Sequence, residues 1–361
     1  MSGSVRPDKA MQESTPGRAF EAYQSFVLGM KLHWTRKLYP RLRESYDARV
    51  GQCEASLDDH EAVAAHFAND LDYAFYAWFE RHLQRMKYSG QRGLVPTHEP
   101  VREVLEEWLD GDLPDGLLSL DPNFSPPRYF TGVDIHQHPG GVCGDTLAGV
   151  IYERASRTTT PLIVKERDLH FRFTKCIEQR ISPTRVVDLG CGFGKSTQPL
   201  YSEFPHARVT GVDLSAPCLK LAARMAAEVQ ATNVIYRQAS AEATQLPTED
   251  CDLVTSTMML HEMPPRAITA MLAEAYRLLI PGGYAIHLDF LASDDPFERF
   301  IHYGHARRNN EPYMPPLNEM DIGAAHQSAG FEDVTVSAFE ELPGALAASN
   351  RNWRFPWALI V

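Results

Sequence analysis

The sequence predicts an α/β fold in which a mainly parallel sheet carries helices on both faces and is joined to a mainly helical N-terminal domain. From about residue 165 onward, short apolar strands alternate with helical segments, which is typical of a parallel sheet. Between residues 18 and 110, apolar residues recur at three- and four-residue spacing, which indicates helices. A chain of 361 residues is long enough for two such regions. We expect a mobile leader over residues 1–17, a mainly helical region over 18–150 and the sheet domain over 151–361.

The composition argues against several classes of function. A net charge of -12 at pH 7 gives no general attraction to a polyanion, so we expect no nucleic acid as a partner. No apolar stretch has the length of a signal peptide or a membrane span, so we expect a cytoplasmic protein without membrane contact. The 6 cysteines form no Cys-x-x-Cys pair, which favours reduced thiols over disulfides or a structural metal. The oligomeric state is left open.

The N-terminal region divides into helices and a proline-rich connector. Aromatic residues stand at helical spacing between His66 and Met86, and we interpret their stripe from Tyr73 to Phe79 as a packing face. Prolines between residues 96 and 127 interrupt regular structure. Two β-prone stretches follow, over residues 128–138 and 147–154, and we expect both to be extended.

The sheet domain begins with a predicted helix over residues 165–181, and two further helices are predicted over 216–229 and 265–279. Seven strands are predicted, and the last two stand close together, which suggests an antiparallel ending. The predicted strands cover residues 184–190, 207–215, 233–240, 252–260, 284–290, 332–339 and 353–361.

A glycine-rich turn follows the first of these strands. Gly190, Gly192 and Gly194 stand at two-residue spacing after Asp188, and the missing Cβ atoms let the backbone approach a ligand closely. The dinucleotide fingerprint GxGxxG would need a further glycine at Lys195, and the phosphate-binding loop GxxxxGK[ST] also fails by one position. The spacing therefore indicates a ligand-binding turn of another kind.

An acidic residue ends the second strand, about twenty residues after the turn. A carboxylate at this place, Asp213, is positioned to accept hydrogen bonds from both hydroxyls of a ribose. A nicotinamide cofactor would use the same geometry. The alternative is structural, with Asp213 or Ser215 capping the N-terminus of the next helix.

Taken in order, these motifs resemble those of class I S-adenosylmethionine-dependent methyltransferases. The pattern DxGxGxG from Asp188 to Gly194 is similar to the family's motif I, the stretch Cys251–Pro264 to motif IV, and Arg277–Gly283 to the turn RxLxPGG. The resemblance spans about residues 165–290. It implies a Rossmann-like seven-stranded sheet of order 3-2-1-4-5-7-6 and S-adenosyl-L-methionine as the cofactor.

The resemblance also implies which residues bind this methyl donor. In the segment after the third strand, Ser240 stands where the family commonly has an acid for the adenine amine, so either Ser240 or Glu242 makes this contact. The implied donor-binding residues are Asp188, Gly190, Cys191, Gly192, Gly194, Asp213, Leu214, Ser240, Ala241, Glu242 and Thr257.

The candidate residues for binding the methyl acceptor are polar, and some of them follow a strand at the expected edge of the sheet. His261 and Glu262 follow the fourth strand, where open α/β sheets bind ligands, and His261 is a candidate base or a pocket-lining residue. Asp134, His136 and His138 alternate along the chain, so an extended backbone would turn all three to one face. That face could bind a metal, line the acceptor pocket or be structural, and we expect no required metal because methyl transfer needs none.

Two more candidates, His302 and Tyr303, lie in the insertion after the fifth strand, where this family commonly adds acceptor-binding structure. The alternative is a solvated helix face. His305 belongs to the same stretch.

The sequence thus predicts methyl transfer to a small-molecule acceptor, an intermediate of natural-product biosynthesis, with proton removal by a pocket base. Two alternatives stay open: a nicotinamide-dependent oxidoreductase, and a cofactor-binding scaffold or an enzyme that uses S-adenosylmethionine for other chemistry. We expect His261 and His136 to be catalytic and to share one cavity. The predicted acceptor-binding residues are Asp134, His138, Glu262, His302 and Tyr303.

Overall fold

The computed structural model describes residues 17–50, 57–159, 168–290, 293–340 and 357–361. The leader predicted over residues 1–17 lies outside the described residues apart from Gly17, and so does Cys53. The other five cysteines are free thiols. Within the described residues, none of the helices combines the length and the apolar character needed to cross a lipid bilayer.

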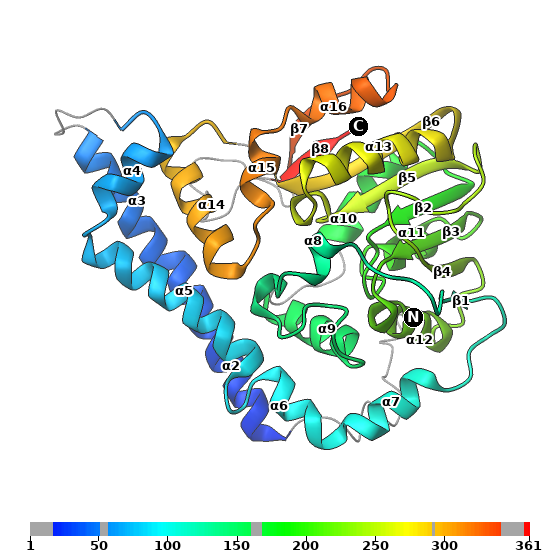
Figure 1. The fold of residues 1–361 in the computed structure, drawn as a ribbon, viewed down its shortest axis with the longest axis horizontal. Helices are drawn as coiled ribbons and strands as arrows, with labels where there is room; N and C mark the ends of the chain where they lie inside the picture. The colour runs from blue at the N-terminus through cyan, green and yellow to red at the C-terminus, as the bar shows by residue number, and fades with distance from the viewer. Residues whose placement is uncertain (1–16, 51–56, 160–167, 291–292, 341–356) are drawn as a thin grey trace.

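A twisted sheet forms the larger part of the molecule (Figure 1). Within the described residues it has eight strands in the order β1-β4-β3-β2-β5-β6-β8-β7, parallel from β1 to β6, with β8 antiparallel to both β6 and β7. Without β1, this is the predicted order 3-2-1-4-5-7-6, which is confirmed; the connector adds β1 at the edge. The strands are β1 (Leu118–Ser119), β2 (Arg185–Leu189), β3 (Arg208–Asp213), β4 (Val234–Gln238), β5 (Cys251–Thr257), β6 (Leu279–Phe290), β7 (Val336–Phe339) and β8 (Trp357–Ile360).

Helices cover both faces of the sheet, as the sequence predicts. On one face, buried side chains of α10 (Leu169–Glu178), α11 (Thr197–Glu203) and α12 (Ala216–Glu228) pack against the strands. On the other face, α13 (Pro265–Leu278) packs against them, and α16 (Ile322–Ala329) covers its flank. Because both faces are apolar and covered, ligands have access only at the strand ends.

The N-terminal region is helical and runs as an arc along one side of the molecule (Figure 1). Its aromatic stripe faces two ways: Tyr76 is fully buried, whereas Phe75 and Trp78 are half exposed, so the interpretation of the whole stripe as a packing face was wrong. The helices are α2 (Arg18–His33), the π-helix η1 (Trp34–Leu38), α3 (Tyr39–Val50), α4 (His60–Phe67), α5 (Leu71–Ser89), α6 (Leu94–His98), the short η2 (Glu99–Val101) and α7 (Arg102–Asp110).

The insertion after β6 joins this region to the sheet domain. It contains α14 (Pro296–Asn309) and α15 (Met314–Glu319), and α14 lies among the N-terminal helices in Figure 1. Its residues Phe297, Phe300 and Ile301 are buried in one core with side chains of α2, α3, α4 and α5.

The two stretches expected to be extended are helical instead. Residues 128–138 form α8 (Arg128–Thr131) and the 3-10 turn η3 (Ile135–Gln137), and residues 147–154 belong largely to α9 (Ala148–Thr159). The buried side chains Leu147, Val150, Ile151 and Ala155 stand at helical spacing, and their burial outweighs the strand preference of valine and isoleucine. The predicted domain boundary at residue 150 lies inside α9.

Candidate functional site

The glycine-rich turn lies at the carboxyl end of β2. Gly190, Gly192 and Gly194 all have positive φ, at 68°, 52° and 84°. Backbone N–H groups of Gly190 and Cys191 donate to Val212 O, which ties the turn to β3. A Cβ at Gly190 would lie 2.4 Å from Met259 Sδ, so both the conformation and the space require glycine there.

Asp213 connects this turn to the start of α12. Its Oδ2 accepts from the Gly192 N–H at 2.8 Å, and its Oδ1 accepts from the Ser215 N–H at 2.8 Å. Ser215 caps α12, because its Oγ accepts from the Cys218 N–H at 3.2 Å. The carboxylate is therefore not the helix cap. Burial raises the pKa of Asp213 to about 6, although its backbone hydrogen bonds act to lower the pKa.

Asp188 lies fully buried beneath the turn. Its Oδ2 accepts from the hydroxyls of Ser196 and Thr197, both at 2.7 Å. Its Oδ1 is buried without a hydrogen-bond partner among the described residues. Burial raises the pKa of Asp188 to about 6, opposed by the two hydroxyls. An unsatisfied buried carboxylate oxygen carries a cost that a bound hydrogen-bond donor would remove.

The other predicted donor-binding residues line the same edge. Ser240 Oγ accepts from the Glu242 N–H at 3.2 Å, and the Glu242 carboxylate accepts from the Tyr129 hydroxyl at 2.6 Å. Ala241 is partly buried against the core, Leu214 O accepts from the Gln238 side chain, and Thr257 ends β5 with its hydroxyl buried. Whether they contact a methyl donor stays a prediction.

The expected Asp134–His136–His138 face does not exist, because the backbone forms the turn η3 instead of a strand. Asp134 Oδ1 accepts from the Gly140 N–H at 3.0 Å, and His138 stacks on Tyr88 at a centroid distance of 4.9 Å. Burial lowers the pKa of His138 to about 4, as expected of a packed imidazole. Among the described residues, no group of three or more His, Cys, Asp or Glu side chains is arranged to hold a metal ion.

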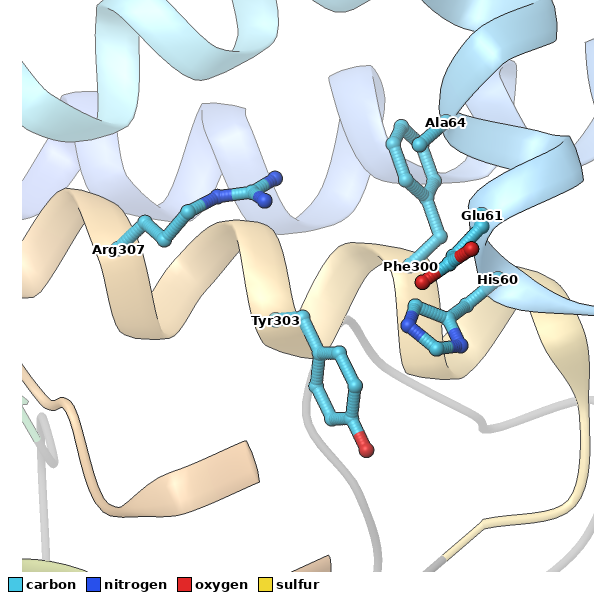
Figure 2. A pocket seen from close by; sticks show the side chains of 6 residues that line it. All are labelled: His60, Glu61, Ala64, Phe300, Tyr303 and Arg307. Atoms are coloured by element: carbon cyan, nitrogen blue, oxygen red, sulfur yellow. The ribbon is translucent and has the colours of Figure 1, made fainter. Parts of the chain in front are cut away.

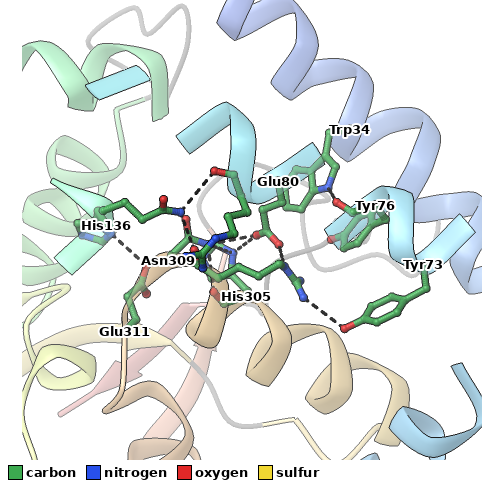
Figure 3. Close-up of polar contacts among 11 residues, drawn as sticks. Trp34, Tyr73, Tyr76, Glu80, His136, His305, Asn309 and Glu311 are labelled. Carbon is green, nitrogen blue, oxygen red and sulfur yellow. Dashed lines mark hydrogen bonds and ion pairs between the residues drawn. The ribbon is translucent and has the colours of Figure 1, made fainter. Parts of the chain in front are cut away.

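His136 alone of these three bridges two carboxylates. Its Nε2 lies 3.2 Å from Glu262 Oε1 and its Nδ1 3.0 Å from Glu311 Oε1, the latter contact drawn in Figure 3. Glu311 is buried and its pKa is about 2: burial raises it, but the charge of His136 and its hydrogen bond outweigh this. Burial lowers the pKa of His136, yet the two carboxylates outweigh it and set the pKa at about 9. We expect His136 to be an imidazolium at neutral pH.

A second histidine–carboxylate pair lies beside this bridge. His261 Nδ1 lies 2.8 Å from Asp289 Oδ1, and Asp289 Oδ2 accepts from the Leu260 N–H at 2.8 Å. The Nε2 atom of His261 has no hydrogen-bond partner among the described residues. Burial lowers the pKa of His261, but Asp289, with smaller contributions from Glu262 and Glu311, raises it to about 9.

The two insertion residues point to different places. His302 is buried against Phe290, with ring centroids 5.5 Å apart, and burial lowers the pKa of its imidazole to about 3, helped by His305 and His261. Tyr303 instead contacts His60 and lines an open pocket between α4 and α14 (Figure 2). The structure therefore brings His302 to the His261 side and leaves Tyr303 at the outer pocket.

Several residues of the site were missed by sequence reasoning. Glu80 of α5 forms ion pairs with His305 and Arg308, and His305 also contacts Glu311; Glu80, His305 and Glu311 are labelled in Figure 3. Asp289 was missed too, although a polar residue at the end of a predicted strand indicates a ligand site. For Glu311, no local sequence pattern indicates a role in the site.

Tyr152 of α9 was also missed, because its segment was expected to be a strand. Its ring lies over the glycine-rich turn: a Cβ at Gly192 would be 3.7 Å from Tyr152 Cε1, and the ring packs edge-on against Phe193. Its hydroxyl has no hydrogen-bond partner among the described residues, and burial raises the pKa of the phenol well above its usual value, with Glu262 contributing. Tyr152 therefore forms one wall above the turn.

Gly149 lets α9 approach α12 closely enough to hold this wall. A Cβ at Gly149 would lie 2.4 Å from Pro217 O, so we expect Gly149→Ala to destabilise the protein by about 1–3 kcal/mol. The control is Gly29→Ala in α2, where a Cβ meets nothing within 4 Å and alanine should be neutral or stabilising by up to about 1 kcal/mol. Urea unfolding measures both; equal effects would contradict the close approach.

The comparisons with known proteins agree with the glycine-rich site. Residues 186–283 match the family described as a methyltransferase domain. The chain is 28% identical over 34% of its length to the tRNA N(3)-methylcytidine methyltransferase Mettl2 of Drosophila melanogaster, covering 42% of that protein. It is 27% identical over 62% of its length to the O-methyltransferase cnsE of Penicillium expansum, covering 79% of it.

Among solved structures, the chain is similar to a putative O-methyltransferase from Nostoc punctiforme, with 18% identity, a TM-score of 0.44 and 59% of each chain covered. The chain spans less than half the length of several of the curated relatives that it matches.

Proposed function

Because the chain carries a class I S-adenosylmethionine-dependent methyltransferase domain together with an additional N-terminal region, we propose that it transfers a methyl group from S-adenosyl-L-methionine to a small-molecule acceptor. The observation that carries this proposal is the position of Asp213, whose carboxylate lies against the Gly192 N–H at the carboxyl edge of the sheet. There the carboxylate can accept hydrogen bonds from the hydroxyls of a ribose, while the rest of the methyl donor lies along the glycine-rich turn.

The residues present fit this donor. Asp213 would hold the ribose, and the unpaired Oδ1 of Asp188 would accept from an ammonium group near the turn. Gly192 leaves space below the Tyr152 ring. When bound, S-adenosyl-L-methionine supplies a methyl carbon on a positively charged sulfur, so the protein must mainly align the acceptor atom and remove its proton.

A small molecule is the acceptor that the site supports best. Tyr152 of α9 lies close to both His136 of η3 and the glycine-rich turn, and the relative cnsE, which matches over the larger share of this chain, is an O-methyltransferase. A tRNA acceptor, suggested by Mettl2, is disfavoured by the net charge of -12. Our proposal for the acceptor is an intermediate of natural-product biosynthesis, as the sequence predicts.

The proposed base is His261. Asp289 fixes its Nδ1 and leaves Nε2 without a described partner, which is the arrangement of an oriented general base. His136 has both ring nitrogens engaged by Glu262 and Glu311, so we do not assign it the predicted catalytic role.

Calorimetric titration tests the proposal directly. S-adenosylhomocysteine and S-adenosylmethionine should bind the purified chain, and neither NAD nor NADP should. Binding of a nicotinamide cofactor alone would favour the oxidoreductase alternative. Labelled methyl transfer to a panel of small hydroxyl and amine compounds, with bulk tRNA as the competing acceptor, then separates an enzyme from a scaffold.

Donor binding should depend on pH through the two buried carboxylates. The pKa values of Asp188 and Asp213 are about 6, and both groups serve the donor only when ionised. Affinity for S-adenosylhomocysteine should therefore be highest well above pH 6 and fall about a hundredfold between pH 7 and pH 5, roughly tenfold for each carboxylate. Titrations across this range, with circular dichroism to verify folding, measure it; a flat profile would contradict the assignment, and Asp188→Asn should reduce the slope.

A further inference from the structure

The bridge around His136 contains two carboxylates with few other partners. Glu262 Oε1 and Glu311 Oε1, here called the carboxylate pair, lie 3.2 Å and 3.0 Å from the two nitrogens of the same imidazole. Glu262 has no other ion pair within the described residues, and the second contact of Glu311 is to His305 at 3.8 Å. The pair therefore holds one cation from two sides.

Two phenols lie near the carboxylate pair, one facing the His136 ring and the other stacked on the neighbouring His138. Tyr88 and Tyr152, here called the phenol pair, come from α5 and α9, and Tyr88 is only 1% exposed. Neither hydroxyl has a hydrogen-bond partner among the described residues. Burial raises the pKa of both phenols, and Glu262 raises the pKa of each further. The hydroxyl of Tyr88 is therefore a polar group without a protein partner on a side chain that is almost fully buried.

The imidazole held by the carboxylate pair sits on unfavourable backbone. His136 and Gln137 have φ values of 57° and 56°, in the left-handed region that favours glycine. Gln137 holds this turn by donating to Arg308 O at 2.6 Å. The Tyr152 ring lies nearly parallel to the imidazole, with centroids 6.4 Å apart. Carboxylates on two sides and an aromatic face on a third are the surroundings that a small organic cation prefers.

We propose that the carboxylate pair and the phenol pair form a subsite for a cationic nitrogen group of the acceptor, which the His136 side chain occupies until the acceptor displaces it. The inference rests on the proposed function, because it names the class of acceptor for the same site. An ammonium group would replace the imidazolium between the two carboxylates, and a free phenol hydroxyl would be available to the acceptor. An anionic acceptor is excluded by the same charges.

A matched pair of probes tests the subsite: phenethylamine, charged at pH 7, and 2-phenylethanol, its neutral counterpart. Calorimetry in the presence of S-adenosylhomocysteine should give at least about tenfold tighter binding of the amine. Glu262→Gln should lower the affinity for the amine by about tenfold and leave the alcohol unchanged. The control is Glu178→Gln on α10, an exposed carboxylate that pairs with Lys175 and should change neither affinity.

The variant His136→Ala tests whether the His136 side chain competes with the amine for the carboxylate pair or helps to bind the amine. Removing the side chain should tighten amine binding by about tenfold, because no ion pair then has to be broken. Weaker amine binding in this variant, equal binding of amine and alcohol to the native protein, or an unchanged amine affinity in Glu262→Gln would each overturn the inference. Binding of S-adenosylhomocysteine to the native protein is measured alongside. If S-adenosylhomocysteine does not bind, the proposed function is wrong. If it binds, a negative result with the amine contradicts only the subsite.

Discussion

Replacing His261 with glutamine should lower turnover by about a hundred- to ten-thousandfold, the usual contribution of a positioned general base. Glutamine keeps a polar side chain of similar reach but cannot take a proton from the acceptor. Affinity for S-adenosylhomocysteine should stay within about twofold, because His261 is assigned to the acceptor and not to the donor. Turnover and calorimetric titration on the same preparation measure both quantities.

Asp289→Asn supplies the diagnostic control for this prediction. With a pKa of about 9, His261 is mostly protonated at pH 7, so turnover should rise with pH, reach half of its maximum near pH 9 and level off above that. Asp289 raises this pKa, so its replacement should lower the pKa and move the rising part of the pH profile to lower pH. If the pH dependence of turnover in Asp289→Asn is the same as in the native protein, His261 is not the base.

Replacing Asp213 with alanine should weaken donor binding by about 1.5–3 kcal/mol, which is roughly ten- to a hundredfold. The variant removes the proposed acceptor for the ribose hydroxyls and also leaves the N–H groups of Gly192 and Ser215 without their partner. The glycine-rich turn should therefore lose order as well as affinity. Titration with S-adenosylhomocysteine measures the change.

Asp213→Asn separates the two effects, because an amide oxygen can still hold one N–H group without carrying a charge. We expect an intermediate affinity for this variant and native-like unfolding in urea. If Asp213→Ala binds S-adenosylhomocysteine as tightly as the native protein does, Asp213 does not bind the ribose, even if the glycine-rich turn loses order.

The sequence predicted the sheet well because its signals are local. Each strand is a short apolar run next to a turn or a helix cap, and the glycine-rich turn and Asp213 follow two neighbouring strands whose carboxyl ends meet at one edge. The order of the seven strands came with the family resemblance, and the structure confirms it. The added strand β1 pairs through only two residues, too few to leave a pattern.

The acceptor side could not be predicted in the same way. His136 and Glu311 are separated by 175 positions in the chain, and no periodicity links such a pair. The common face expected for Asp134, His136 and His138 does not form, because the alternation predicts a strand whereas the backbone makes a tight turn at His136. For Tyr152, flanking β-branched residues favoured a strand locally, but four buried apolar residues at helical spacing determined the outcome.

The burial of Phe297, Phe300 and Ile301 among the N-terminal helices has a consequence for how the molecule folds. These side chains belong to an insertion in the sheet domain, so the core among the N-terminal helices is completed by residues from both halves of the chain. Neither half alone can exclude water from that core, and the chain should melt cooperatively as one unit. The N-terminal helices are then not a detachable appendage: their docking is thermodynamically coupled to the sheet edge where the acceptor would bind, and a substitution far from that edge can alter its shape.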